Sequence, residues 1–251
     1  MKYVRYIKDD GVAYGILEGN KIKELRGSFL ETAEMTGNEA SLDSVTLLSP
    51  VDFSKAVCIG LNYRDHAEEF ELPIPESPVV FLKPSTSAIG HEGRIIYPEI
   101  CHRLDYEAEL AVVIRKPCRF VKQEDASDYI LGYTIANDVT ARDLQPKNGQ
   151  WTIAKSFDTF MPLGPYISDE VDPSDLMITS RVNGETKQKS NTSNLIFNVP
   201  YLVSYLSQIM TLLPGDVIST GTPGGISGMN VGDVVEIEIE GLGILRNTIS
   251  R

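Results

Sequence analysis

The sequence is poor in cysteine and contains no long apolar run. Its three cysteines, Cys58, Cys101 and Cys118, show no CxxC spacing and leave an odd count, which argues against a disulfide framework or a zinc ribbon. No apolar run approaches the ~18 residues of a membrane span. The N-terminal residues also lack the apolar stretch of a signal peptide. We therefore expect a cytoplasmic protein with no membrane partner.

Basic clusters are missing too. The chain has 35 acidic residues against 23 lysines and arginines, for a formal net charge of -12, and no basic run is longer than two residues. Nucleic-acid binding needs a basic face, so we expect no nucleic acid partner. A small anionic substrate still fits if the site is locally positive, because salt screens charge beyond ~8 Å.

Several common catalytic signatures are absent. The chain contains no GxSxG and no HExxH, which argues against a serine hydrolase and a zinc protease. The stretch GTPGGISG at 221–228 lacks the Gly-Lys-Ser/Thr ending of a phosphate-binding loop. We expect it to form a tight turn whose backbone a ligand can approach closely.

Strand-forming segments dominate the pattern. Residues 1–50 predict a small β-rich unit with strands KYVRYI, VAYGIL and KIKEL, turns at Asp10-Gly11 and Gly19-Asn20, and a helical turn in FLETAEM. Residues 51–251 form a larger region whose predicted strands are AVCIGLNY, PVVFLKP, RLDYEAELAVVI, ILGYTIAND, MITSRVNGETKQKS, GDVIST and DVVEIEIEGLGILRNTI. Asn183-Gly184 predicts a tight hairpin.

Two segments of the larger region have helical character. KQEDASDYILG is expected to end at Gly132 as a C-cap. VPYLVSYLSQIMTLLPGD has Pro200 in its first turn and apolar residues at helical spacing, and it is stopped by Pro214-Gly215. The fold class predicted from these patterns is α+β with β-structure dominant.

Three acidic residues alternate with apolar ones in RLDYEAELAVVI. In a strand, Asp105, Glu107 and Glu109 would share one face, with neighbours roughly 7 Å apart at a rise of about 3.3 Å per residue. Two glutamates at that spacing can converge on a hard cation such as Mg²⁺, Mn²⁺ or Ca²⁺. The alternative is the solvated face of an edge strand, which this segment alone favours.

The next segments favour a site over a surface. YTIANDVTARDLQ predicts a second strand that ends in a carboxylate, Asp138, with Arg142 and Gln145 just past its end. Lys155 follows in an apolar setting within WTIAKSFDTF. An acid, an arginine and a lysine after strand ends indicate a functional cluster.

These stretches resemble the fumarylacetoacetate hydrolase (FAH) family. The matching segments, in the family's order over about 56–225, are GLNYRDHAEEF, FLKPST, LDYEAELAVVI, YTIANDVTARDLQ, AKSFDTFMPLGP and PGDVISTGTPGG. The resemblance implies an FAH-type mixed β-sheet roll, barrel-like, as a catalytic domain over 51–251. It implies a small β-rich N-terminal domain over 1–50, and usually a homodimer.

The resemblance also implies a metal centre holding Mg²⁺ or Mn²⁺. Its ligands would be Glu107, Glu109 and Asp138. Asp105 would lie behind the ligands or on the surface, and Lys155 would lie beside the bound substrate.

Further roles follow from the same resemblance. Arg142 and Gln145 would hold the carboxylate or other oxygens of a small anionic 2-oxo acid, and Thr222 would contact its carboxylate. His66 and Glu69 would form a general acid/base pair. Their spacing of three residues puts both on one face of a helical turn, although a surface histidine on a polar helix is the alternative. We expect the following ELPIPESP to act as a mobile lid, and His91 and His102 to be surface or structural residues.

The implied chemistry is that of a metal-bound enolate. A 2-oxo acid can chelate the ion, which stabilises the charge left when a C–C bond breaks. Acylpyruvate-type hydrolysis or oxaloacetate-type decarboxylation is the first expectation. The alternative is the isomerisation of 2-hydroxyhepta-2,4-diene-1,7-dioate and decarboxylation of 5-oxopent-3-ene-1,2,5-tricarboxylate in homoprotocatechuate catabolism. A non-catalytic 2-oxo acid binder is a third reading.

Overall fold

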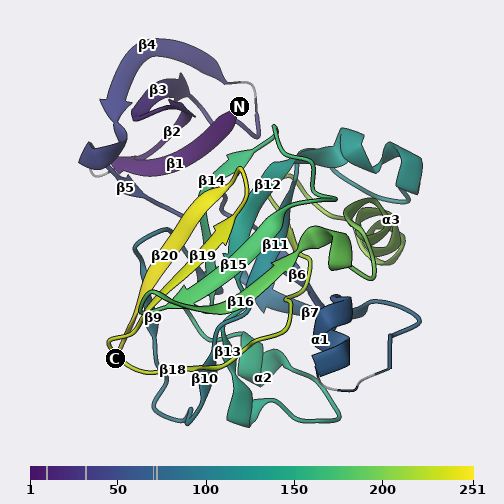
Figure 1. Ribbon diagram of the computed structural model, residues 1–251. Coiled ribbons are helices and arrows are strands. Elements are labelled where there is room, and N and C mark those ends of the chain that lie inside the picture. Colours follow the sequence, from purple (N-terminus) through teal and green to yellow (C-terminus); the bar gives the residue numbers. More distant parts are fainter. Residues whose placement is uncertain (10, 32, 70, 72) are drawn as a thin grey trace.

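The computed structural model describes residues 1–9, 11–31, 33–69, 71 and 73–251. Within this part of the chain, the strands form three sheets (Figure 1). The largest has the spatial order β4 (Glu34–Ser41), β3 (Lys21–Arg26), β2 (Gly11–Glu18), β1 (Lys2–Lys8), β14 (Met161–Ser168), β12 (Ile130–Asn137), β11 (Ala108–Ile114), β17 (Val217–Ser219), β6 (Lys55–Gly60) and β7 (Val79–Pro84). Two short strands pair off this path: β5 (Thr46–Leu47) with β1, and β8 (Ala88–Ile89) with β14.

The second sheet lies across the face of the first and contains β16 (Glu185–Asn191), β15 (Met177–Val182), β19 (Val234–Ile239), β20 (Gly243–Ser250) and β9 (Arg94–Ile96). The third is small and contains β13 (Thr140–Ala141), β10 (Leu104–Asp105) and β18 (Gly228–Met229).

The α-helices are short: α1 (Arg64–Glu69), α2 (Thr152–Lys155) and α3 (Val199–Ile209). The 3₁₀ helices are η1 (Leu42–Ser44), η2 (Ser85–Ser87), η3 (Gln123–Tyr129), η4 (Arg142–Leu144) and η5 (Thr192–Asn194). No helix among the described residues is long and apolar enough to cross a membrane. The predicted β-dominated α+β class is confirmed.

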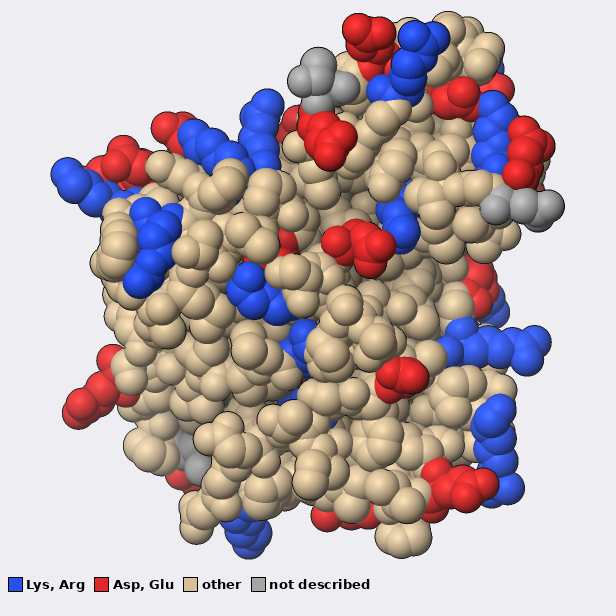
Figure 2. All heavy atoms as spheres, turned by 180° about the vertical axis from the view of Figure 1, so that it is seen from behind, with Lys and Arg blue, Asp and Glu red and all other residues tan. Residues whose placement is uncertain are grey.

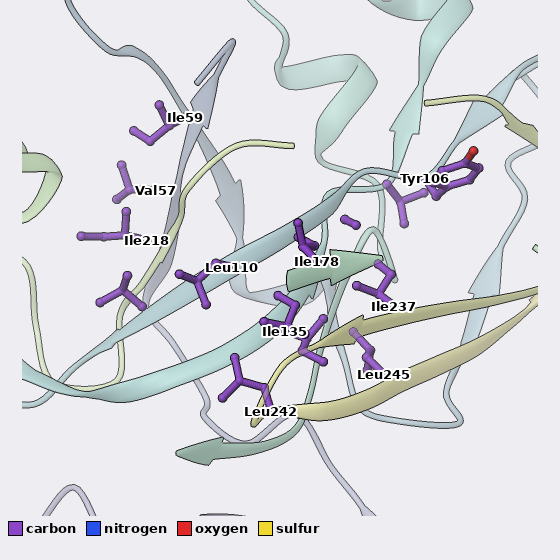
Figure 3. Close-up of a cluster of buried hydrophobic side chains, with 14 of the residues drawn as sticks. Val57, Ile59, Tyr106, Leu110, Ile135, Ile178, Ile218, Ile237, Leu242 and Leu245 are labelled. Carbon is purple, nitrogen blue, oxygen red and sulfur yellow. The ribbon is translucent and has the colours of Figure 1, made fainter. Parts of the chain in front are cut away.

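The main hydrophobic core fills the space between the two larger sheets. Leu110 of β11 and Ile135 of β12 point toward Ile178 of β15, Ile237 of β19 and Leu245 of β20 (Figure 3). All five side chains are buried, and burying one such chain stabilises the fold by about 1.5–3 kcal/mol. This core fixes how the two sheets stack, and so fixes the strand ends that carry the site.

Strand β11 is buried along its whole length. Its even-numbered residues, such as Leu110 and Val112, join the main core, while Ala111 and Val113 pack into a second cluster on the opposite face. The strand lies between β12 and β17. The solvated edge-strand reading of this segment is therefore wrong.

The predicted strand RLDYEAELAVVI is interrupted. Asp105 belongs to β10 in the small sheet, and β11 begins only at Ala108. The break falls at Tyr106 and Glu107, and the backbone N–H of Glu107 donates to the side-chain Oδ1 of Asn137 at 3.0 Å instead of to a backbone carbonyl of a neighbouring strand. The three acids thus do not share one continuous strand.

One predicted helix is wrong and one is confirmed. KQEDASDYILG forms η3 and then enters β12, so Gly132 is a strand residue and no helix cap. A Cβ at Gly132 would lie 2.6 Å from the carbonyl oxygen of Ser168, so glycine permits close pairing with β14. Helix α3 forms as expected, with Asn198 as N-cap and Pro200 in its first turn.

Strand predictions elsewhere hold for most segments, including the β15–β16 hairpin at Asn183-Gly184. In FLETAEM, Glu34 and Met35 belong to β4 instead of a helical turn. Thr32 of that segment and Asp10 of the first turn lie outside the described residues. The Gly19-Asn20 turn joins β2 to β3.

The first 50 residues are tied directly into the large sheet. Strand β1 pairs antiparallel with β2 and also with β14, through Lys2 opposite Ser168 and Tyr3 opposite Ile167. Figure 1 shows β1–β5 projecting at one end of the molecule. The boundary between residues 50 and 51 stays a prediction.

Charge is dispersed on the surface in view in Figure 2. Lysine and arginine side chains stand singly or beside acidic ones, separated by broad uncharged areas. Some are paired, as Lys21 is with Glu39. The face in view therefore shows no cluster of basic side chains.

Candidate metal centre and pocket

Three carboxylates converge at one end of the β11–β12 pair. Ala108 lies opposite Asn137, so the next opposed pair is Glu107 and Asp138, joined by the Asp138 N–H and the Glu107 carbonyl at 2.9 Å. Glu109 lies two residues further along the same face as Glu107. Ligand oxygens of Glu107, Glu109 and Asp138 all lie within 4.8 Å of one another, and the three side chains are buried.

Among the residues that the structure describes, the hydrogen-bond donors to Glu109 are neutral. Its Oε2 accepts from the hydroxyl of Ser219 and from the backbone N–H of Gly221 at 3.0 Å, both supplied by β17 and the residues after it. Burial, together with the negative charges of Asp138 and Glu107, raises the pKa of Glu109 to about 8. This carboxyl therefore holds a proton at neutral pH unless a cation takes the place of that proton.

Two buried lysines reach the cluster from different elements. The Nζ of Lys155, at the end of α2, donates to Glu107 Oε2 at 2.8 Å and to Asp138 Oδ2 at 2.6 Å. Burial lowers the pKa of Lys155, but Asp138 and Glu107 outweigh it and the net shift is upward. Lys155 is thus a fixed cation.

Lys83 of β7 is the second buried lysine. It is fully buried, pairs with Asp138 Oδ1 at 2.6 Å, and donates to the backbone carbonyls of Val139, at 3.0 Å, and Phe160. Asp138 therefore has a lysine on each oxygen. Burial lowers the pKa of Lys83, while Asp138 opposes this shift.

Arg142 connects the cluster to a further buried acid. Its Nη2 donates to Glu107 Oε1, its Nε to Asp105 Oδ2 at 2.8 Å, and its Nη1 to Gln145 Oε1. Burial would raise the pKa of Glu107, but Lys155 and Arg142 hold it well below its usual range. Asp105 is fully buried, so it is not a surface residue: it supports Arg142 from behind.

These groups border a pocket of about 420 Å³. Its polar lining brings together the side chains His66, Arg103, Glu107, Glu109, Arg142, Gln145, Lys155 and Thr222. The rest of its wall is mainly apolar: Ile59, Gly60, Leu61, Val79, Phe81, Trp151 and Ile226. A concave apolar site with a few converging polar groups is typical of a small-molecule pocket.

His66 and Glu69 lie on one face of α1, as their spacing predicts. His66 Nδ1 is 3.7 Å from Glu69 Oε2, and the His66 side chain is 13% exposed against 42% for Glu69. Burial lowers the pKa of His66, and the charges of Glu107 and Glu69 oppose this shift. His66 lines the pocket, whereas Glu69 is anchored by the Gly225 N–H at 2.9 Å.

The loop after β17 joins α1 to the carboxylate strand. Gln188 donates to Thr222 Oγ1 and to the Pro223 carbonyl, both at 2.8 Å, while its Oε1 accepts from the Ala108 N–H at 3.1 Å. The hydroxyl of Tyr106 donates to the Gly225 carbonyl at 2.8 Å. The glycines of GTPGG thus allow side chains of the protein itself to approach the loop backbone closely. A Cβ at Gly224, for example, would lie 2.7 Å from Glu69 Oε2.

The arrangement brings all nine predicted site residues to one region: His66, Glu69, Glu107, Glu109, Asp138, Arg142, Gln145, Lys155 and Thr222. Sequence reasoning missed Lys83, Arg103, Gln188 and Ser219. A lysine inside the apolar strand PVVFLKP is a local signal for the first of these. Ser219 and Gln188 have no such signal, because only the sheet pairings bring them to Glu109 and Thr222.

The predicted lid and the other histidines are placed as follows. Glu71 and residues 73–78 have no regular secondary structure, and Phe70 and Leu72 lie outside the described residues. His91 Nδ1 accepts from the Arg246 N–H at 3.2 Å, and the backbone N–H of His102 donates to Asp143. Neither histidine lines the pocket of the carboxylate cluster.

The donor set fits a hard divalent cation. Three carboxylates from two strands, crowded within 4.8 Å in a buried setting, are costly without compensating charge. Oxygen-only ligands suit Mg²⁺ or Mn²⁺ better than zinc. Glu109 has no cationic side chain among its hydrogen-bond partners in the described residues. A bound cation would therefore lower the electrostatic cost of ionising this carboxyl most.

Family models match the chain in two parts. Residues 55–250 match the model described as fumarylacetoacetate (FAA) hydrolase C-terminal. Residues 1–50 match the model described as Rv2993c-like, N-terminal. A curated relative, oxaloacetate tautomerase Fahd2a, mitochondrial, of Rattus norvegicus, is 43% identical over 217 residues, which are 82% of this chain and 69% of that protein.

Two solved structures are also similar. The 2-hydroxyhepta-2,4-diene-1,7-dioate isomerase from Mycobacterium marinum is 43% identical with a TM-score of 0.93, covering 100% of this chain and 98% of that one. The maleylpyruvate hydrolase from Sphingobium sp. SYK-6, in complex with manganese (II) ion and pyruvate, is 28% identical with a TM-score of 0.84, covering 100% and 99%.

Proposed function

Because this chain belongs to the fumarylacetoacetate hydrolase family, we propose that it is a divalent-metal-dependent enzyme acting on 2-oxo acids. The observation that carries the proposal is the convergence of Glu107, Glu109 and Asp138 within 4.8 Å beside a pocket lined by cations. The similar maleylpyruvate hydrolase structure, with manganese and the 2-oxo acid pyruvate, supports this class of ligand.

Glu107, Glu109 and Asp138 would hold Mg²⁺ or Mn²⁺. When bound, the ion supplies a Lewis acid for the substrate's carbonyl oxygen. Lys155 adds a fixed positive charge beside the cluster, where burial makes it more effective than in water. The ion and Lys155 would together stabilise the negative charge that develops on the substrate's carbonyl oxygen.

Three side chains have hydrogen-bond donors that no described residue accepts, and these could bind a substrate. Arg142 uses three of its five N–H groups on Asp105, Glu107 and Gln145, so two are left. Gln145 accepts with its oxygen and keeps its NH₂ group, and Thr222 accepts from Gln188 and keeps its hydroxyl proton. These donors suit the oxygens of a carboxylate and a neighbouring carbonyl.

Cleavage of a C–C bond is the leading reaction. His66 would take a proton from water, and the water oxygen would add to the acyl carbonyl of an acylpyruvate. The C–C bond then breaks, its electron pair stays with the pyruvate portion, and His66 returns the proton to that carbon. With oxaloacetate, carbon dioxide would leave in place of the acyl group.

Proton transfer without cleavage is the second candidate. The full-length similarity to the M. marinum isomerase and the similarity to the rat oxaloacetate tautomerase favour it. The same site would serve, with His66 moving a proton between positions of the substrate. Homodimer formation and the mobile lid stay predictions.

Parallel assays distinguish these candidates. Purified protein with Mg²⁺ is given an acylpyruvate, oxaloacetate and the dienedioate, and cleavage, carbon dioxide release and isomerisation are followed separately. We expect cleavage or decarboxylation to dominate, and turnover of the dienedioate alone would establish the second candidate instead. His66→Ala should lower kcat by about 10²–10⁴-fold while Mg²⁺ and oxalate still bind. A wild type that binds both and turns over nothing would be a non-catalytic binder.

A further inference from the structure

Arg103 is a second arginine of the pocket, and its backbone is held on both sides. Its N–H donates to Asp143 Oδ1 at 3.1 Å, and its carbonyl accepts from the Arg142 N–H at 2.8 Å. Its side chain lines the pocket and is 54% exposed. The position of this arginine is therefore set by the fold, while its end meets solvent.

One buried carboxylate orients both arginines. Arg103 Nε donates to Asp105 Oδ1 at 2.9 Å, and Arg142 Nε donates to Asp105 Oδ2 at 2.8 Å. The terminal nitrogens of Arg142 are engaged by Gln145 and Glu107. Within the described part of the chain, the Nη1 and Nη2 atoms of Arg103 have no protein partner. Arg103 thus presents the planar fork that matches a carboxylate.

The ionised groups of the pocket leave room for two negative charges. The charged groups that line it, or belong to the buried ion-pair network behind it, are Lys83, Arg103, Arg142, Lys155, Asp105, Glu107, Glu109 and Asp138. With a divalent cation in place of the Glu109 proton, the four positive and four negative charges of these side chains cancel, and the cation adds two positive charges. Glu69, 42% exposed at the mouth, is largely screened by solvent.

Apolar side chains complete the pocket that contains both features. Val79, Phe81 and Trp151 line it together with the carboxylates and Arg103. They suit the carbon chain of a substrate whose two ends are polar.

We propose that Arg103 binds the far carboxylate of a dicarboxylic 2-oxo acid and so selects diacids over monoacids. This inference rests on the proposed function, which places the 2-oxo acid end at Glu107, Glu109 and Asp138. Arg103 is a specificity residue: it contacts the substrate's tail and leaves the reacting atoms to the other groups.

A pair of unreactive ligands tests this. 2-Oxoglutarate and 2-oxopentanoate share a 2-oxo acid end and chain length, but the second has a methyl group where the first has a carboxylate. Calorimetry with saturating Mg²⁺ should show that the wild type binds 2-oxoglutarate roughly 10–100-fold more tightly. Arg103→Met should abolish this preference through weaker 2-oxoglutarate binding, with 2-oxopentanoate unchanged. Arg103→Lys, which keeps the charge and loses the fork, should retain part of it.

Arg94→Met is the matched control. Arg94 is exposed on β9, outside the pocket, and replacing it by methionine removes the same positive charge as Arg103→Met does. It should keep the wild-type preference. Equal binding of both ligands by the wild type would overturn the role of Arg103 and leave the proposed function standing. So would an Arg103→Met variant that weakens both ligands equally, since that result indicates a structural role through Asp105. Failure of the wild type to bind either ligand would reject the proposed function, and this inference with it.

Discussion

At the scale of single residues, the site is a set of buried charges with unequal partners. Asp105, Glu107 and Asp138 each contact at least one lysine or arginine. Glu109 instead accepts from a hydroxyl and a backbone N–H, and the pKa of this carboxyl is raised to about 8 by burial and by Asp138 and Glu107. Among the three proposed ligands, Glu109 is therefore the one whose ionisation would depend most on a bound cation.

Lys83 is predicted to stabilise the fold through Asp138. Lys83→Met would leave Asp138 Oδ1 and the carbonyls of Val139 and Phe160 without their buried donor. Breaking a buried pair in this way costs about 3–5 kcal/mol. Urea denaturation should show a loss of this size in the free energy of unfolding. Lys21→Met, at an exposed pair with Glu39, is the control and should unfold like the wild type. A Lys83 variant equal to that control would refute the prediction.

His66 is predicted to act as a base with a pKa below the usual 6.5, because burial disfavours its charged form. Only the neutral imidazole can accept a proton, so kcat/KM should rise with pH through that lowered pKa and then level off. Glu69 opposes the shift. Glu69→Gln should therefore move the midpoint to still lower pH. Activity profiles of the two proteins check this, and a midpoint that stays fixed or moves upward contradicts it.

At this scale, the sequence indicated the clustered carboxylates better than the residues that support them. Glu107 and Glu109 alone favoured a solvated face, and it was Asp138, Arg142 and Lys155, together with the family resemblance, that indicated a site. Arg103 and Gln188 look like ordinary polar residues. Their importance depends on contacts with Asp105 and Thr222, which are far from local in the case of Gln188.

At the scale of elements, the loop 221–226 connects α1 to the strand that carries the carboxylates. Its Gly225 N–H binds Glu69, and its Thr222 is held by Gln188, which also contacts Ala108. The loop thus links α1 to the strand that carries the carboxylate cluster. Its geometry depends on glycine.

Gly225→Ala is predicted to disturb both stability and activity. Gly225 has φ +93°, and a Cβ there would clash with the backbone carbonyl oxygen of Lys187. The loop would have to move, at a cost of about 1–3 kcal/mol, and would release Glu69. The unfolding temperature and kcat should both fall.

Gly184→Ala is the matched control for this change. Gly184 has φ +80° in the β15–β16 turn, and a Cβ there would meet nothing within 4 Å. The control should lose some stability through backbone strain and keep the wild-type kcat. Equal kcat in the two variants would show that the loop does not position α1.

Elements with a local pattern were predictable from the sequence, and those defined by their neighbours were not. Strand β6 and helix α3 follow from apolar patterning and caps. Strand β14 contains Pro162, Gly164 and Pro165, which argue against a strand, yet it is buried between β12 and β1. The prediction of a helix end at Gly132 was wrong, because the actual role of this glycine is close pairing with β14, over thirty residues away in the sequence.

At the scale of the whole molecule, the site lies where several distant segments meet. The carboxylates come from β11, the residue before it and the residue after β12. The lysines come from β7 and α2, and the histidine comes from α1. The stacking of the two larger sheets (Figure 3) holds these strand ends in register. The net charge of -12 also favours binding of a cation at the buried acidic cluster.

Metal binding should therefore stabilise the entire fold. A ligand that binds only the native state at 100 times its Kd adds about 2.7 kcal/mol. Saturating Mg²⁺ is expected to raise the unfolding temperature of the wild type and to have a much smaller effect on Glu109→Gln, which loses one negative ligand. Calorimetric melting of both proteins, with and without Mg²⁺, measures this. An equal rise in both would place the stabilising ion elsewhere.

The most direct test is diffraction from crystals grown with Mn²⁺, using the anomalous signal of manganese. We predict one strong peak within coordination distance of a carboxylate oxygen of each of Glu107, Glu109 and Asp138. A map with no peak at these three carboxylates, or with its only peaks at surface acids, would contradict the account.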